Sequence, residues 1–313
     1  MADSFEKARE RMLKGTRAEI KETYSNEEHA LMQAINAYLD TSKSFNLAFE
    51  RLSEWFGIYY PEVKVQNPLT LARLAHIIDA GISEESVKAA VGDAKTGDEI
   101  FKEMSSAMGR KPNDDEKRAV SIFAETCLHL ANSLEYMDAY LKVAAERILP
   151  NTTYLTDEKI AAELLAKAGS LERLATMPAS TIQLLGAEKA LFKHIKFGSK
   201  PPKYGVLFKL QEVSGAPKEM RGRIARAYAT KISIGLKGDF YSKRFIAEKL
   251  KADLQKSIEK IKASPPREKK PEPPQERRQF RRPGFQQRQQ HGRPQGGRGR
   301  NSGRGGARFR NSA

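Results

Sequence analysis

The side chains of this sequence best suited to chemistry are cations and hydroxyls that recur along residues 217–237. Their spacing would place them on one face of a helix: Arg223, Arg226, Thr230, Ser233 and Lys237. Arginine and lysine donate to phosphate oxygens, arginine in bidentate fashion, and serine and threonine add short-range donors. Apolar Ile224, Tyr228 and Ile232 fall on another side. The pattern predicts a helix over 217–236 with one packed side and one phosphate-binding side.

A second group of lysines precedes this helix. Three are spaced for one helical face and two lie in a loop rich in glycine and proline: Lys189, Lys193, Lys196, Lys200 and Lys203. A single basic helix face is commonly only a solvated surface, but two adjoining basic segments favour a nucleic-acid partner. His194 lies among these lysines, and its position alone is compatible with an RNA-facing role or with an ordinary, partly exposed helix residue.

The sequence carries no catalytic or metal-binding motif. The five histidines, at positions 29, 76, 129, 194 and 291, form no HExxH motif and have no carboxylate at metal-ligand spacing. There is no Walker loop, no GxGxxG turn after a strand and no GxSxG elbow. The single cysteine, Cys127, excludes a disulfide framework and falls on a predicted core position. We therefore expect a non-catalytic protein with no metal ion and no cofactor.

The charge of the chain is unevenly distributed. Its 313 residues carry 55 Lys and Arg against 39 Asp and Glu, a net charge of +16. Residues 1–181 sum to −7, whereas residues 182–250 sum to +10 and residues 264–313 to +11. This division predicts an acidic first half joined to a basic binding module and a basic tail, and it favours a polyanionic partner.

Segment composition suggests a soluble, intracellular chain of four parts. No run of about 18 apolar residues could span a membrane, and the N-terminus lacks the apolar core of a secretory signal. The parts are a short N-terminal segment (1–26), a helical and coiled-coil region (27–176), a basic module (177–263) and a tail (264–313). The tail is rich in Arg, Gly, Gln and Pro, so we expect it to be disordered and to add RNA affinity without specificity.

Hydrophobic periodicity predicts an all-α body. A strict 3.5-residue period runs through residues 114–149 and a weaker one through 83–108. The polar break between them predicts an antiparallel coiled-coil hairpin with its tip near Lys111. Further helices are expected over 27–56, 157–168, 170–176, 178–197 and 242–262, and a short strand over 206–208.

The continuous heptads also predict self-association. They leave apolar positions that one hairpin does not fully cover. We therefore expect a homodimer whose contacts include Phe123, Leu130, Leu134 and Met137. A monomeric wild-type protein at micromolar concentration would contradict this expectation.

Distinctive sequence motifs occur in and around the basic module. Residues 177–208 read MPASTIQLLGAEKALFKHIKFGSKPPKYGVLF, and residues 213–242 read VSGAPKEMRGRIARAYATKISIGLKGDFYS. Upstream stand RLSEWFGIYYPEV (51–63) and ILPNTTYLTDEKIAAELLAKAGSLERLA (148–175). Over about residues 27–250 the chain resembles the Nop domain of archaeal and eukaryotic box C/D ribonucleoprotein scaffolds. The motifs GAEKALF and KPPKYGV are the most specific for this family.

The resemblance implies an all-helical, non-catalytic scaffold that homodimerises through its coiled coil. Its Nop module would bind a box C/D-type guide RNA jointly with a kink-turn-binding protein of the L-seven-A-like family, in support of rRNA 2′-O-methylation or processing. Fibrillarin would supply the methylation chemistry. Matching positions assign RNA or ribonucleoprotein binding to Gln183, Gly186, Ala187, Glu188, Lys189, Arg223, Arg226 and Lys231, and the basic composition adds Lys193, His194, Lys200 and Lys203.

The sequence departs from the family pattern at its N-terminus. Family members carry a globular fibrillarin-docking domain ahead of the coiled coil, and the 26 residues here are too few to enclose one. We therefore expect fibrillarin to join only through a separate docking polypeptide. The alternative function is an assembly factor of another ribonucleoprotein, either spliceosomal or a methylation-independent paralogue. The expected location is cytoplasmic in an archaeon and nucleolar or nuclear in a eukaryote.

Overall fold

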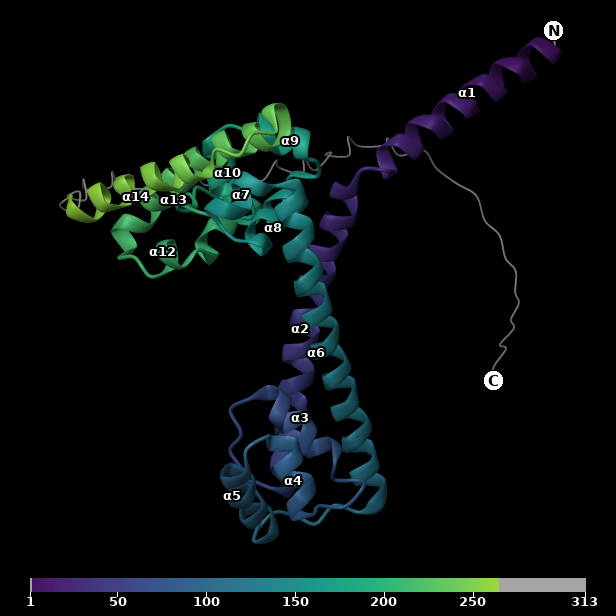
Figure 1. Ribbon diagram of the computed structural model, residues 1–313, viewed down its shortest axis with the longest axis vertical. Coiled ribbons are helices and arrows are strands. Elements are labelled where there is room, and N and C mark those ends of the chain that lie inside the picture. The colour runs from purple at the N-terminus through teal and green to yellow at the C-terminus, as the bar shows by residue number, and fades with distance from the viewer. Residues whose placement is uncertain (1, 265–313) are drawn as a thin grey trace, which may run out of the picture. The chain divides into compact units, whose positions relative to one another are not determined.

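Residues 2–264 form a helical fold in this computed structural model, which describes the backbone of these residues and the side chains of 5–21 and 24–264 (Figure 1). Within them the structure contains no β-strand. The predicted all-α class is therefore confirmed. The predicted disordered tail, apart from Ser264, lies outside the described residues.

The helices divide into two groups along the chain. The first six are α1 (Ala2–Tyr24), α2 (Glu27–Tyr59), α3 (Pro68–His76), α4 (Glu84–Val91), α5 (Ala94–Ser105) and α6 (Asp114–Ile148). The others are α7 (Pro150–Leu155), α8 (Glu158–Ala168), α9 (Leu171–Thr176), α10 (Ala179–Leu184), α11 (Glu188–Phe197), η1 (Val206–Lys209), α12 (Gln211–Ser214), α13 (Lys218–Lys237), η2 (Gly238–Ser242) and α14 (Ala247–Ala263).

Helices α2 and α6 lie side by side as an antiparallel pair (Figure 1). The start of α2 shares a core with the end of α6, where Leu31 and Leu141 are fully buried. The end of α2 shares a second core with the start of α6, where Leu52 and Val120 are fully buried. Between these cores neither helix has a buried side chain. The pair is therefore anchored at both ends and has a half-exposed seam in its middle.

The predicted partner of α6 is wrong. Residues 83–108 do not form the other arm of the hairpin, because they are divided into the short helices α4 and α5, which pack against each other. Gly92 ends α4 in the left-handed conformation, with φ of +81°, and the Asp93 side chain caps α5 by accepting from the Thr96 N–H. A 3.5-residue period shows that a helix has a continuous seam, but it does not identify the helix that fills it.

Helix α13 is central to the second group. Its predicted apolar stripe, Ile224, Tyr228 and Ile232, is buried together with residues of α8, α9 and α10. The same core contains the start of α2 and the end of α6. Residues on both sides of position 176/177 thus share one core, and the four-part division of the chain stays a proposal.

Three local predictions in this group are corrected. Residues 178–197 form two helices instead of one, because Gly186 turns the chain with φ of +90°. Residues 206–208 belong to a 3₁₀ turn instead of a strand. The last helix begins at Ala247 instead of 242, because Gly238–Ser242 form a single π-helical turn.

A buried carboxylate joins this π-helical turn to α7. Asp239, which is 2% exposed, accepts four hydrogen bonds. Asn151 donates its backbone N–H and Nδ2 to Oδ1 at 2.9 and 2.8 Å, and Thr152 donates its backbone N–H and hydroxyl to Oδ2 at 3.1 and 2.8 Å. Burial raises the pKa of Asp239, and these hydrogen bonds oppose the rise. The network fixes the end of α13 against the start of α7.

Helix α1 exposes its apolar side chains. Phe5 and Met12 are 79% and 73% exposed, and none of the described side chains of α1 is buried. No helix among residues 2–264 combines the length and the apolar character needed to cross a membrane.

Candidate nucleic-acid interface

The basic face of α13 is narrower than the sequence predicts. Arg226, Thr230 and Lys237 are exposed and Arg223 is half-buried, but Ser233 is buried and cannot contribute to an accessible face. The Thr230 hydroxyl donates to the Arg226 carbonyl at 2.9 Å, so it is used within the helix. Arg223 and Arg226, one turn apart, are the main cations of this face.

Lys231 has a partner inside the protein. Its ammonium group lies 3.1 Å from Asp253 Oδ2 on α14, and its side chain is 20% exposed. The hydrogen bond and charge of Lys231 lower the pKa of Asp253. Because the pair joins α13 to α14, we interpret Lys231 as a structural residue in the free protein.

Gln183 is buried and holds the loop that follows α11. Its Nε2 donates to the Lys203 carbonyl at 2.6 Å and to the Gly222 carbonyl of α13 at 3.4 Å. The backbone carbonyl of Gln183 accepts from the Gly205 N–H at 2.9 Å. One amide side chain thus fixes the loop 198–205 to α13 and places Lys203 beside the basic helix. We interpret Gln183 as a residue that positions cations, since its polar atoms are turned inward.

Gly186 makes the sharp turn between α10 and α11. A Cβ atom there would lie 2.7 Å from Val206 Cγ2, and the Gly186 N–H donates to Glu188 Oε1 at 2.6 Å. Across the turn, a Cβ atom on Gly205 would collide with the Leu185 carbonyl oxygen. The GAEKALF and KPPKYGV motifs therefore contact each other here, because both glycines permit the close approach of two backbone segments.

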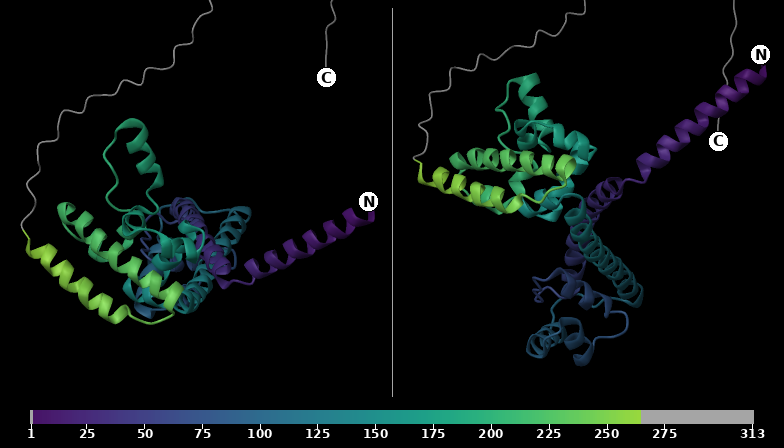
Figure 2. Two further views of the ribbon diagram at one scale, coloured as in Figure 1. Left: turned by 90° about the horizontal axis from the view of Figure 1, so that it is seen from above. Right: turned by 45° about the horizontal axis from the view of Figure 1, so that its top comes forward.

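Helix α11 begins after Ala187 and has no buried residue. In the left view of Figure 2 it projects, with its return loop, as a teal-green hairpin. Its exposed lysines are Lys189, Lys193 and Lys196. Phe192, Ile195 and Phe197 are 59%, 74% and 66% exposed. Helix α11 thus exposes three large apolar side chains among its ten residues, beside its lysines.

His194 lies where α11 meets its return loop. It is half-buried, and its Nδ1 hydrogen-bonds with the carbonyl oxygen of Ser199. One nitrogen of the ring is therefore used to close the end of the helix. Lys200 and Lys203 are exposed on the loop itself.

Sequence reasoning missed a stack of two aromatic rings and one cation beside this loop. Tyr204 and Phe208 are stacked, with centroids 4.8 Å apart and planes 12° apart. The Arg221 guanidinium lies 5.5 Å from the Phe208 ring, and its Nε donates to the Ala216 carbonyl at 2.8 Å. Their spacing gave no signal of the stack, because Tyr204 precedes the 3₁₀ turn that contains Phe208 and the two residues share no helix.

These elements define what we call the α11–α13 surface. It comprises the cations Lys189, Lys193, Lys196, Lys200, Lys203, Arg223 and Arg226, and the apolar side chains Phe192, Ile195 and Phe197. Its cations can neutralise phosphates, and its apolar side chains can be covered by a base or by a protein partner.

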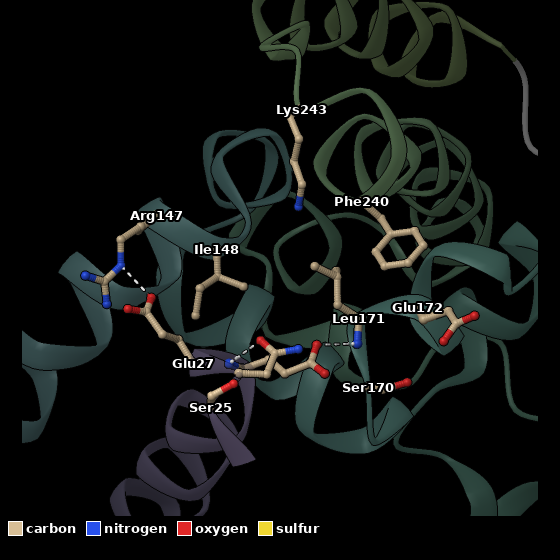
Figure 3. Close-up of a pocket in the computed structure, with 11 residues that line it drawn as sticks. Ser25, Glu27, Arg147, Ile148, Ser170, Leu171, Glu172, Phe240 and Lys243 are labelled. Carbon is tan, nitrogen blue, oxygen red and sulfur yellow. Dashed lines mark hydrogen bonds and ion pairs between the residues drawn. The ribbon is translucent and has the colours of Figure 1, made fainter. Parts of the chain in front are cut away.

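A separate pocket of about 470 Å³ lies at the start of α2 (Figure 3). Glu27 forms an ion pair with Arg147 at 2.9 Å, and the Glu28 carboxylate accepts from the Leu171 N–H at 2.9 Å. Lys243 extends toward these residues from the other side. The described residues that line the pocket include no histidine or cysteine and no residue of the α11–α13 surface. The carboxylates of Glu27 and Glu28 have structural partners, and we assign the pocket no catalytic role.

Metal chemistry has no support in the described residues. Residues 2–264 contain no group of three or more His, Cys, Asp or Glu side chains placed to hold a metal ion. Cys127 is fully buried in the second core of the α2–α6 pair, and burial raises the pKa of its thiol. The interpretation of Cys127 as a core thiol is confirmed.

Three relatives show which proteins this chain is similar to in sequence. An uncharacterized NOP5 family protein of Methanocaldococcus jannaschii is 34% identical over 257 residues, which are 80% of this chain and 61% of that protein. Nucleolar protein 56 of Dictyostelium discoideum is 33% identical over 235 residues (72% of this chain, 43% of that protein). Nucleolar protein 58 of Schizosaccharomyces pombe is 35% identical over 218 residues (68% and 42%). The chain thus spans less than two thirds of the length of these relatives.

A solved structure and a family model complete the comparison. A chain from a crystal structure of a fibrillarin/Nop5p complex is 21% identical, with a TM-score of 0.47 over 82% of this chain and 78% of that chain. The model of the Nop family, described as "snoRNA binding domain, fibrillarin", matches residues 37–260, which is more than half of the chain. The chain therefore belongs to the Nop family.

Proposed function

We propose that this chain is a non-catalytic, RNA-binding scaffold of a box C/D-type guide ribonucleoprotein that supports rRNA 2′-O-methylation or processing. The observation that carries the proposal is the family match over residues 37–260, because that range contains every residue of the α11–α13 surface. The description of the family as a snoRNA binding domain supports the class of RNA. The cations of the surface support binding through phosphates.

The mixed character of the α11–α13 surface supports recognition of RNA together with a protein. Phe192 and Phe197 are exposed beside lysines. Aromatic side chains are enriched in protein interfaces, from which lysine is depleted, whereas lysine suits phosphates. The proposed protein partner is a kink-turn-binding protein of the L-seven-A-like family that is already bound to the RNA.

Fibrillarin is the proposed source of the methylation chemistry. The description of the family model names fibrillarin, which supports its presence in the same assembly. We propose that it joins through a docking polypeptide other than α1, because none of the described side chains of that helix is buried.

The RNA that copurifies with the chain tests the proposed function. Sequencing this RNA should give molecules with box C and box D elements and a kink turn. Enrichment of a spliceosomal RNA, or of RNA without these boxes, would favour the alternative of an assembly factor for another ribonucleoprotein.

Replacing Gln183 by Ala should release the return loop of α11. The Lys203 carbonyl would lose a part-buried hydrogen bond of 2.6 Å and the Gly222 carbonyl a longer one of 3.4 Å, at a cost of about 0.5–1.5 kcal/mol in the free energy of unfolding. RNA binding should weaken as well, because Lys203 would no longer be held beside α13. The matched control is Gln211→Ala, which removes an exposed amide and should change stability by less than about 0.5 kcal/mol. Urea unfolding and gel shifts measure both effects, and an unchanged RNA affinity for Gln183→Ala would contradict the positioning role.

We also propose a homodimer, through a face of α6 that differs from the predicted one. Phe123, Leu130, Leu134 and Met137 are half-buried, and Leu134 lies seven residues from both Cys127 and Leu141, which are buried on the α2 side. Further apolar side chains are exposed on another side of α6, at positions related by heptad spacing and with His129 at the position between the first two: Ile122 (56%), Tyr136 (79%), Tyr140 (45%) and Val143 (65%). This spacing supports a coiled-coil contact with a second copy of the chain.

The double variant Tyr136→Glu/Val143→Glu should therefore be a monomer in sedimentation experiments at concentrations where the wild type is a dimer. Its helix content should change little, because both side chains are exposed in the single chain. Leu134→Asp should instead lower the free energy of unfolding by about 1–3 kcal/mol, because it places a carboxylate in the seam with α2. A double variant that stays dimeric would contradict the assignment of this face.

A further inference from the structure

Exposed aromatic rings and cations gather at the end of α13 opposite to Arg223. Tyr154, at the end of α7, and Phe245, just before α14, meet edge to face with centroids 5.5 Å apart and planes at 84°. They are 42% and 53% exposed. The Lys251 ammonium lies 4.6 Å from the centroid of the Tyr154 ring and donates to the Tyr154 carbonyl at 3.2 Å. We call Tyr154, Phe245, Lys251 and Arg244 the aromatic–basic patch.

A buried asparagine holds this patch in place. The Asn151 side chain donates from Nδ2 to the Arg244 carbonyl at 2.8 Å and accepts from the Ile246 N–H at 2.6 Å. Asn151 is fully buried and is itself bound to Asp239. The backbone on both sides of Phe245 is therefore fixed to the helix that carries Tyr154. Ring surfaces held in this way lose little freedom when they bind a partner.

The charges around the patch favour a polyanion. In residues 243–251 the exposed cations are Lys243, Arg244, Lys249 and Lys251, against one exposed carboxylate, Glu248. The nearby carboxylate of Asp239 is 2% exposed and is used inside the protein. Protein interfaces are depleted in lysine, whereas phosphate-binding surfaces are enriched in it.

We propose that the aromatic–basic patch is a second RNA-binding site, which binds a single-stranded segment by stacking unpaired bases on Tyr154 and Phe245 and by placing phosphates on Lys251 and Arg244. Aromatic side chains beside cations are the usual means of binding unpaired nucleotides. The 20 residues of α13 separate this site from the start of the α11–α13 surface by about 30 Å. The inference rests on the proposed function in one respect, that the chain binds RNA.

Removing both rings tests the site. In the full chain, Tyr154→Ala/Phe245→Ala should weaken binding of an oligouridylate of about 12 nucleotides by about tenfold or more, because each stacked base contributes about fivefold or more and the variant removes two stacking rings. The matched control Tyr154→Phe/Phe245→Tyr keeps both rings and should bind as the wild type does. Lys251→Gln should reduce the slope of log affinity against log salt by about one. Thermal unfolding should stay cooperative in all three variants, with only a small shift of the midpoint where the ring pair or the Lys251 contact is lost, since the altered side chains are exposed.

Photocrosslinking separates failure of this site from failure of the proposed function. The complex of the full chain, a box C/D RNA containing 4-thiouridine and the kink-turn protein is irradiated, and crosslinked peptides are identified. Crosslinks on Tyr154 or Phe245 would support the second site. Crosslinks on α11 or α13 alone, with unchanged oligouridylate binding by the double alanine variant, would overturn it and leave the proposed function intact. Loss of kink-turn-protein binding by that variant in the absence of RNA would also overturn it, in favour of a protein interface.

Discussion

Replacing Arg223 and Arg226 together by alanine should weaken the assembly of RNA, kink-turn protein and this chain by about 3–6 kcal/mol, at about 1.5–3 kcal/mol for each charged hydrogen bond lost. The two side chains lie one turn apart on α13, and Arg226 is exposed. Neither residue is needed to hold the buried stripe of Ile224, Tyr228 and Ile232, so the fold should be kept. A gel shift with the purified components measures the loss.

The control for this experiment removes the same charge elsewhere. Lys95→Ala/Lys102→Ala takes two exposed cations from α5, which is remote in sequence from the α11–α13 surface. It should lower RNA affinity only slightly, through the net charge of the protein. If both double variants weaken the assembly equally, the effect is one of overall charge and the assignment of Arg223 and Arg226 is wrong.

Asp239→Ala should give the largest loss of stability, about 3–5 kcal/mol in the free energy of unfolding. The substitution leaves four donors of Asn151 and Thr152 without an acceptor, and both residues are fully buried. Each buried, unsatisfied group costs about 1–3 kcal/mol, and partial relaxation reduces the sum. Urea unfolding monitored by circular dichroism measures the change.

The exposed carboxylate of Asp40 provides the matched control. Its ion pair with Lys43 lies on the surface of α2, where both side chains are more than 70% exposed, so Asp40→Ala should cost less than about 1 kcal/mol. A similar small loss for Asp239→Ala would show that the network does not fix α7 against α13. In that case the preformed state of the aromatic–basic patch would also lose its support.

Local patterns in the sequence predicted the helices well. The expected helices at 27–56 and 114–149 correspond to Glu27–Tyr59 and Asp114–Ile148. Their signals are local: Asn26 and Asn113 cap the two N-termini through their side chains, and acidic residues follow in each first turn. The pairing of helices depends on contacts between distant residues, and there the prediction of the hairpin partner failed.

At the candidate site, too, local features could be predicted from the sequence and contacts between distant segments could not. Sequence spacing identified Arg223 and Arg226, of which the structure leaves Arg226 exposed and Arg223 half-buried. It could not show that Gln183 is turned inward, that Lys231 is paired with Asp253, or that Ser233 is buried, because each of these facts depends on another segment of the chain. The aromatic–basic patch was likewise beyond sequence reasoning, since Tyr154 and Phe245 are brought together by Asn151 across about ninety residues.

The most direct test of the proposed function is a titration of one box C/D RNA with this chain, in the presence and absence of the kink-turn protein and at a fixed salt concentration. The α11–α13 surface combines phosphate-binding cations with exposed Phe192, Ile195 and Phe197, so we expect weak binding to RNA alone and binding at least about a hundredfold tighter when the second protein covers these apolar side chains. An equal affinity with and without the kink-turn protein would contradict joint recognition and show that the chain binds RNA by charge alone.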